Sequence, residues 1–152
     1  ATESCGAASA TGLRGAAIAT GDQGAVIAKG SWGTASATGN WGAVIAKGSW
    51  GTASATGLRG MAIATGRCGT AIATGDQGTA IATEIGCVAM TTGINGMVKG
   101  AAGDAIVCVE RGEWDGSTYP ITAILSAIVD GEVIKEDTWY TVVDGAWVEL
   151  KD

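Results

Sequence analysis

The side chains that could perform catalysis are few in this sequence of 152 residues. It contains no His, so the usual catalytic triads and the commonest general base are absent. Glu110, Glu113 and Asp115 form a carboxylate cluster, but they surround an expected hairpin turn, where carboxylates are normally solvated. We therefore expect a protein that is not an enzyme.

Metal and cofactor sites have equally little support from the residue types. The four Cys residues include no CxxC pair and His is absent, so the ligand spacing typical of zinc sites does not occur. We expect no metal site and no cofactor.

Charge and composition argue against two further classes. Nine Lys and Arg against fifteen Asp and Glu give a net charge of −6, whereas binding to nucleic acid needs a basic stripe. The sequence shows no apolar stretch of membrane-spanning length and no signal peptide pattern, so we expect no membrane span. With 26 Gly, no Phe and abundant Ala, a core can form only if small side chains stack in regular layers.

A repeat provides those layers. Read in nines from Ala1, the chain follows an ATGxxGxAx pattern to Lys99, with two degraded units at the end. Residues 24–39 recur without change at residues 42–57, which lie two nonapeptides farther along, so we expect two nonapeptides per coil. Fixed periods of this kind are typical of solenoids. We predict an all-β protein in which residues 1–99 form a two-sheet β-solenoid of about 18 residues per coil.

The motif also indicates which side chains face inward. Positions 3 and 6 of most nonapeptides are Gly, and we expect both to adopt positive φ in tight turns. Positions 7, 8, 9, 1 and 2 then form a strand in which positions 8 and 1 share one face. These two positions are almost uniformly Ala or Val, so we expect them inside. The alternative, with Ile inside, would bury Lys29 and Lys47 unpaired, which is costly.

The two outer faces should differ. One carries a column formed by Ile27, Ile45, Ile63 and Ile81. Such a strip marks either a self-association surface or a β-branched ladder that packs along the stack. The other carries Thr20, Thr34, Thr38, Thr52, Thr56, Thr70, Thr74 and Thr92. These form either an organised hydroxyl array or a surface of ordinary strand residues.

Within the repeats, Trp occurs at the fifth position of the nonapeptide, which lies in a turn. We expect Trp32 and Trp50 to stack in successive coils on one edge, with Trp41 on the other edge. Exposed Trp suits an interface or a sugar-binding ridge, and alternation with Arg suits a self-shielding cation–π ladder instead.

Cys68 and Cys87 are separated along the chain by little more than one coil. This spacing permits a disulfide on one edge, and the alternative is that both remain free thiols.

Residues 100–152 have a different pattern. Alternating segments at 105–110, 119–129, 138–143 and 146–150 are separated by turn signals such as Asp130-Gly131 and Asp144-Gly145. We predict a C-terminal antiparallel β-meander that covers the last coil, because an open strand edge recruits other chains. The first coil has no such cap in the sequence, so we expect another copy or upstream residues to cover it.

Three resemblances bear on these expectations. The repeats resemble the calcium-binding β-rolls of RTX toxins, but only Asp22 and Asp76 occupy turns, so the calcium ladder is not expected. The Thr face resembles the ice-binding faces of insect antifreeze solenoids, with Ile18, Ile72 and Met90 interrupting it. Residues 1–99 are more similar to ATGxxGxAx repeat proteins of bacterial and phage genomes, which often end in a segment like residues 134–150. That group has no established activity, so the likeness implies the fold and transfers no functional residue.

The function we predict is a non-enzymatic structural or binding module, a homo-oligomer that presents a repetitive flat surface to a macromolecular partner. The alternative is an ice-binding protein that uses the Thr face. A second alternative is a phage or cell-surface adhesin that grips glycans with Trp32, Trp41 and Trp50.

Overall fold

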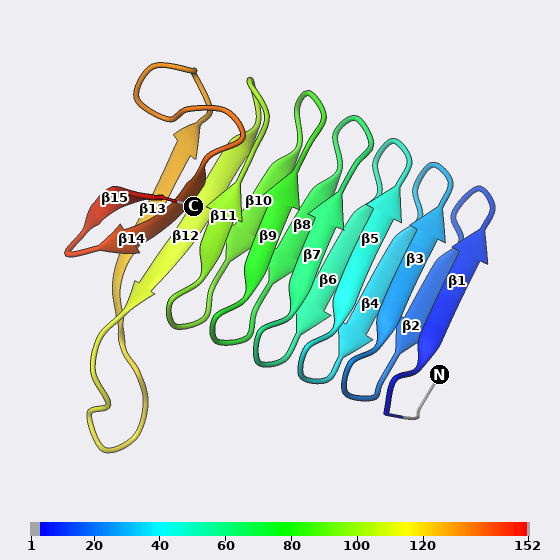
Figure 1. Cartoon of the computed structure of the whole chain (residues 1–152), viewed down its shortest axis with the longest axis horizontal. Coiled ribbons are helices and arrows are strands. Elements are labelled where there is room, and N and C mark those ends of the chain that lie inside the picture. The colour runs from blue at the N-terminus through cyan, green and yellow to red at the C-terminus, as the bar shows by residue number, and fades with distance from the viewer. Residues whose placement is uncertain (1–3, 152) are drawn as a thin grey trace.

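In the computed structural model, which describes residues 4–151, the chain is a two-sheet β-solenoid in which each coil consists of two nonapeptides (Figure 1). The predicted fold class is confirmed. The first sheet, sheet A, contains in spatial order β1 (Ala7–Thr11), β3 (Ala25–Lys29), β5 (Ala43–Lys47), β7 (Met61–Ala64), β9 (Thr79–Ala82), β11 (Met97–Lys99), β14 (Trp139–Val143) and β15 (Ala146–Leu150). Sheet B contains β13 (Ile121–Ile128), β12 (Ala105–Arg111), β10 (Val88–Thr91), β8 (Thr70–Ala73), β6 (Thr52–Thr56), β4 (Thr34–Thr38) and β2 (Ala16–Ala19).

The core between the sheets is made of the small residues that the motif places inward. Val26 and Ala28 of β3 are 0% and 1% exposed, whereas Ile27 and Lys29 on the same strand face outward. Parallel strands of successive coils pair in register, so that like residues stack in columns. The prediction that positions 8 and 1 lie inside is confirmed, and the alternative with Ile inside is wrong.

The turns differ from the prediction in where positive φ occurs. It is the fifth residue of each repeat from Cys5 to Asn95 that is left-handed, with φ between 54° and 78°. At position 3 only Gly30, Gly48 and Gly57 have clearly positive φ, and no described Gly at position 6 does, so the expectation is wrong for position 6 and holds at position 3 in these three repeats alone.

Space, not φ, requires most of these glycines. A Cβ on Gly75 would lie 1.9 Å from the carbonyl oxygen of Gly57 in the preceding coil, and one on Gly66 would lie 2.1 Å from that of Gly48. At position 6, a Cβ on Gly78 would lie 2.8 Å from the oxygen of Gly75 in its own turn. Successive coils therefore touch backbone to backbone along both edges.

The C-terminal strands lie close to the predicted ranges but do not form one meander. β12 pairs in parallel with β10, so it continues sheet B, and β13 returns antiparallel to β12. The β14–β15 hairpin instead joins sheet A through the pair Val98 and Tyr140. The predicted cap therefore divides into two hairpins that extend both sheets, seen at the left in Figure 1.

Larger side chains close this end of the core. Ile106, Val129, Ile134, Tyr140 and Val142 are buried in a cluster continuous with the Ala layers. The connecting segment of residues 130–138 crosses the end, where one carboxylate oxygen of Asp130 accepts hydrogen bonds from three successive backbone N–H groups. At the other end, no strand within residues 4–151 pairs with the outer edges of β1 and β2. None of the described residues forms a helix long and apolar enough to cross a membrane.

Candidate binding surfaces

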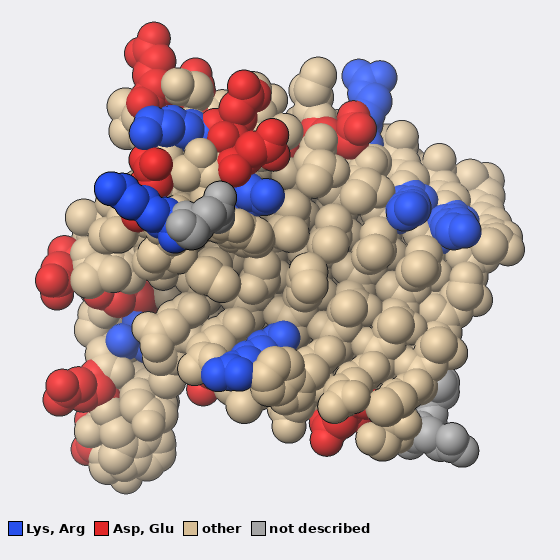
Figure 2. Space-filling model, in the orientation of Figure 1, with Lys and Arg blue, Asp and Glu red and all other residues tan. Residues whose placement is uncertain are grey.

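The outward side of sheet A, which we call the isoleucine face, has Ile27, Ile45, Ile63 and Ile81 as its central column. These residues pair in register across β3, β5, β7 and β9. Each is half-buried by its neighbours on the sheet. β14 extends the face with Trp139, whose ring lies 4.9 Å from Lys99 Nζ. Charged side chains gather along the rim and over the C-terminal strands in the view of Figure 2, and few cross the middle.

Charges of opposite sign lie at opposite ends of the strands of this face. Lys29 and Lys47 end β3 and β5 and stack in register. Asp22 and Asp76 lie in the turns before β3 and β9, at the other ends of the strands. Their carboxylates accept backbone hydrogen bonds from the next coil, at 2.8 Å from Asn40 N and 3.0 Å from Ile94 N. The face is therefore electrically polar along the strand direction.

The outward side of sheet B, the threonine face, carries the predicted Thr columns. Thr34 pairs with Thr52 and Thr38 with Thr56, with Ser36 and Ser54 between them. β4 and β6 carry hydroxyl groups at all three of their outward positions. On the strands to either side, β2 and β8, the middle outward position is occupied by Ile18 and Ile72. Farther along, Ile124 and Ile128 of β13 are 65% and 66% exposed. The ice-binding hypothesis stays a prediction, with its regular array limited to two coils.

The edge tryptophans are arranged as expected. Trp32 and Trp50 stack with ring centroids 5.4 Å apart and an angle of 9° between the rings. On the opposite edge, the Arg59 guanidinium lies 4.7 Å from the Trp41 ring and donates a hydrogen bond of 2.6 Å to Gln77. The predicted stack is confirmed, and one member of the predicted cation–π ladder is present on the Trp41 edge. Each of the three Trp residues remains 53% exposed.

Cys68 and Cys87, considered above for a disulfide, are both free thiols in the structure. Cys87 replaces a position-6 Gly and points inward, where its Sγ donates to Gly66 O at 2.9 Å and accepts from Gly69 N at 3.2 Å. Burial raises the pKa of this thiol. The Cys87 side chain thus occupies the position that is Gly in most other coils, and its thiol hydrogen-bonds the backbone of the neighbouring coil.

Asp104 continues this column one coil farther and is fully buried. Its carboxylate accepts hydrogen bonds of 2.9 Å from Cys87 N and from Ala101 N. Burial raises the pKa of Asp104 above its ordinary value of 3.8, against the opposing effect of those hydrogen bonds. The turn here is one residue shorter, since Val88 pairs with Ala105 and not with residue 106.

This carboxyl should make the stability of the protein depend on pH. Because the folded state holds the Asp104 proton more tightly than the unfolded chain does, its stabilising contribution is full below pH 3.8 and is lost as pH rises through the raised pKa. Urea unfolding across this range should show the wild type gaining free energy of unfolding on acidification relative to Asp104→Asn, which does not titrate. A difference between the two proteins that stays constant with pH would contradict this assignment.

Of the carboxylate cluster noted in the sequence, Glu110 holds the C-terminal hairpins together. Glu110 accepts hydrogen bonds from the backbone N–H groups of Asp144 at 2.6 Å and Gly145 at 3.1 Å, which ties the first hairpin to the second. Asp115 accepts from Ser117 N and Thr118 N, both at 2.8 Å, within its own loop. Backbone N–H donors, Thr118 first, hold the pKa of Asp115 below its ordinary value. Among residues 4–151, no group of three His, Cys, Asp or Glu side chains is arranged to hold a metal ion.

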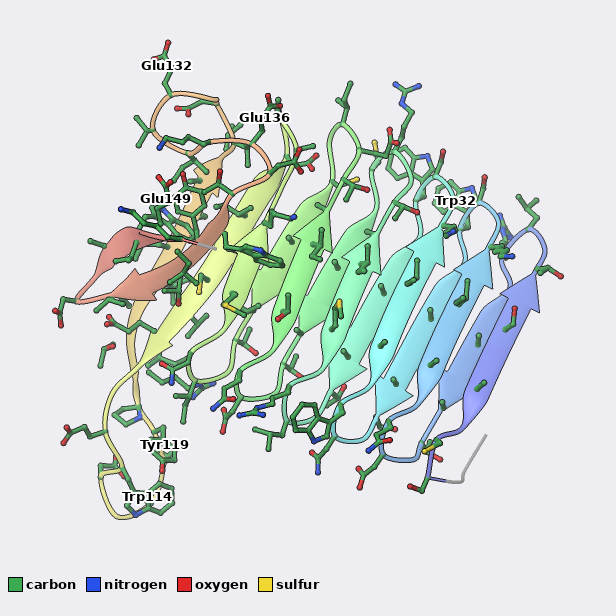
Figure 3. All side chains as sticks on the ribbon, in the orientation of Figure 1. Trp32, Trp114, Tyr119, Glu132, Glu136 and Glu149 are labelled. Carbon is green, nitrogen blue, oxygen red and sulfur yellow. The ribbon has the colours of Figure 1, made fainter. Side chains whose placement is uncertain are left out.

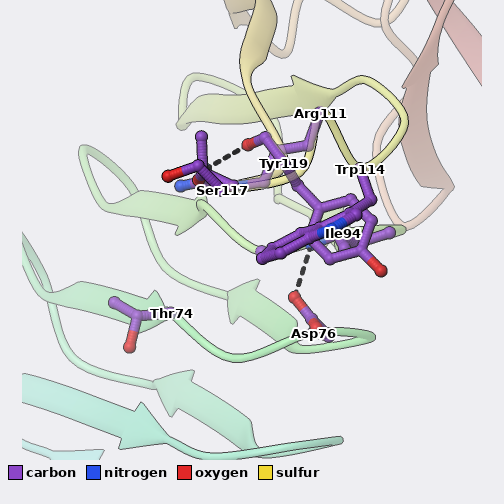
Figure 4. A pocket seen from close by; sticks show the side chains of 9 residues that line it. Thr74, Asp76, Ile94, Arg111, Trp114, Ser117 and Tyr119 are labelled. Carbon is purple, nitrogen blue, oxygen red and sulfur yellow. Dashed lines mark hydrogen bonds between the residues drawn. The ribbon is translucent and has the colours of Figure 1, made fainter.

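A pocket that the sequence did not predict lies beneath the loop of residues 112–120, which joins β12 to β13. It has a volume of about 260 Å³ and is lined by Thr74, Asp76, Gly93, Ile94, Arg111, Trp114, Ser117, Thr118 and Tyr119. Figure 4 shows the aromatic rings of the loop meeting two neighbouring solenoid turns, one carrying Asp76 and the other Ile94. Trp32, Trp41 and Trp50, which were expected to hold glycans, do not line it. The sequence feature that could have indicated this pocket is the concentration of aromatic and hydroxyl residues at 112–120.

Comparison of the chain with protein-family models, with curated proteins and with solved structures found no match.

Proposed function

We propose that the protein is a non-enzymatic structural module that associates with a second copy of itself through the isoleucine face. The observation that carries this proposal is the unbroken in-register column of Ile27, Ile45, Ile63 and Ile81. None of the described elements covers it. Contiguous apolar surface of this kind on a flat sheet is typical of a protein–protein contact. The likeness to ATGxxGxAx repeat proteins bears on the fold alone and adds no activity.

The size of the face suggests a weak contact. Eight strands about 4.8 Å apart and five residues long give a surface of roughly 38 Å by 16 Å, about 600 Å². Stable complexes of standard size bury about 800 Å² on each partner. We therefore expect a dimer that dissociates on dilution, with a Kd in the micromolar range or weaker.

The charges favour one orientation of the two copies. If the two-fold axis runs along the solenoid, strand directions oppose each other across the interface. Lys29 of one copy then faces the turn before β3 of the other, which carries Asp22, while Lys47 faces the uncharged turn before β5. With strands running in the same direction, the strand ends that carry the lysines would lie along the same edge in both copies, and Lys29 would have no Asp22 opposite it.

The test compares two substitutions at the same repeat position on opposite faces. Ile45→Lys should weaken dimerisation at least about tenfold, because it buries an unpaired charge at the centre of the contact. Ile72→Lys, on the threonine face, is the matched control, since Ile72 is also a half-buried ninth-position residue. Sedimentation velocity over a concentration series measures both. The proposal is wrong if the wild type remains monomeric at high concentration, or if Ile72→Lys dissociates the dimer as strongly as Ile45→Lys.

A further inference from the structure

The loop of residues 112–120 presents a pair of aromatic side chains beyond the edge of the solenoid. Trp114 and Tyr119 have ring centroids 5.2 Å apart at an angle of 58°, and they are 56% and 41% exposed. Figure 3 shows both at the tip of this loop, far from Trp32 on the opposite edge. A ligand with an apolar face could pack on these exposed rings and bury their apolar surface, which is favourable.

The loop is held in this conformation before any ligand binds. Asp115 bonds the backbone of its own turn, and Gly112 N donates to Pro120 O at 2.8 Å at the base. Arg111 bridges the loop to sheet B, since Nε donates to Thr92 O at 2.7 Å and one terminal nitrogen donates to Tyr119 O at 3.0 Å. Binding a ligand therefore costs little conformational entropy, because the loop is already ordered.

Polar groups converge on the same pocket from the solenoid and from the loop. Asp76 uses Oδ1 to accept from Ile94 N, which leaves Oδ2 as an acceptor with no partner among the described residues. The second terminal nitrogen of Arg111 is likewise a donor with no partner within residues 4–151. The hydroxyls of Thr74 and Ser117 add groups that can both donate and accept.

We propose that this pocket binds a neutral pyranose sugar. The apolar C–H face of a pyranose can pack on the ring of Trp114, while its hydroxyls bond the free Asp76 oxygen and the free Arg111 nitrogen. A volume of about 260 Å³ suits a single ring. The cation Arg111 is balanced by Asp76 in the pocket, and Glu113 and Asp115 lie on the loop, so a sulfated or sialylated sugar would meet repulsion. This site is separate from the isoleucine face and does not depend on dimerisation.

The experiment is a titration of the full chain with the methyl glycosides of glucose, galactose, mannose and N-acetylglucosamine, followed by NMR of the Trp indole N–H groups. At least one glycoside should shift the Trp114 signal, with a Kd of about 1 mM, as expected for one ring on an open site. Trp114→Ala should weaken binding about tenfold, and Asp76→Asn should weaken it less, because Asn keeps an acceptor for Ile94 N. Trp41→Ala removes an equally accessible ring on the same edge and should leave binding unchanged.

Three results would overturn the proposal. The first is the absence of any indole shift at about 50 mM of every glycoside, well above the expected Kd. The second is binding that Trp114→Ala does not affect while its melting temperature matches that of the wild type. The third is a preference for sulfated or sialylated sugars, or for a proline-rich peptide, over all neutral glycosides. Repeating the titration on Ile45→Lys separates this result from the oligomeric state.

Discussion

Gly75→Ala is expected to destabilise the solenoid by about 3 kcal/mol or more and to lower its melting temperature by roughly 6–12 °C. The added Cβ would lie 1.9 Å from the carbonyl oxygen and 2.3 Å from the carbonyl carbon of Gly57. Both are backbone atoms and cannot rotate away, so the two coils would have to separate. That separation would strain hydrogen bonds between coils such as Arg59 N to Asp76 O, 2.8 Å. Thermal unfolding followed by circular dichroism measures the effect.

Gly12→Ala is the matched control for this substitution. Gly12 occupies the same position of the repeat, but a Cβ there would have no atom within 4 Å outside its chain neighbours. The melting temperature should change by no more than about 2 °C, as for an ordinary surface substitution. Equal losses in the two variants would mean that position 3 needs Gly for its backbone conformation and not for space.

Ala53→Leu is expected to cost about 3 kcal/mol, the second large effect. Ala53 is fully buried on β6 and stacks between Ala35 on β4 and Ala71 on β8, which are also fully buried. Sheet A faces this column with closely packed Ala and Val side chains, so the three added carbons have no void to enter. The sheets cannot move apart easily, because each short turn, such as Gly48–Gly51, joins them directly.

Ser54→Leu provides the comparison on the same strand. Ser54 is the next residue and faces outward, where a leucine side chain extends into solvent. Its free energy of unfolding in urea should stay within about 0.5 kcal/mol of the wild type. Comparable losses in both variants would contradict the alternation of inward and outward residues on β6.

The sequence made the coil predictable because its two periods are strict. The unchanged recurrence of one segment two nonapeptides later gives the coil length, and the uniform Ala and Val at two positions identify the inside. The stacking of Trp32 on Trp50 followed from that recurrence alone. By contrast, a Gly required by φ and a Gly required by contact with the next coil look the same in a sequence. For this reason the left-handed residue was assigned to positions 3 and 6, while the structure has it at position 5.

The C-terminal region was less predictable because local patterns do not name pairing partners. Alternation marked the four strands, but nothing in it assigns β13 to sheet B and the β14–β15 hairpin to sheet A. The pocket was missed for the same reason. It forms only where the loop carrying Trp114 meets Asp76, and the two lie far apart in the sequence. Such a contact can be predicted only after the pairing of the strands that carry the loop and the turn is known.

The in-register stacking of identical coils makes the length of this protein adjustable in fixed steps. Residues 24–39 and 42–57 are the same sequence, and each pairs onto its copy without any change of geometry. Adding or removing one such pair of nonapeptides would insert or delete one strand in each sheet and change the length by about 4.8 Å. The loop pocket would be unaltered, because it is built from residues after Ala73. The length of the solenoid can therefore be varied in steps of one coil.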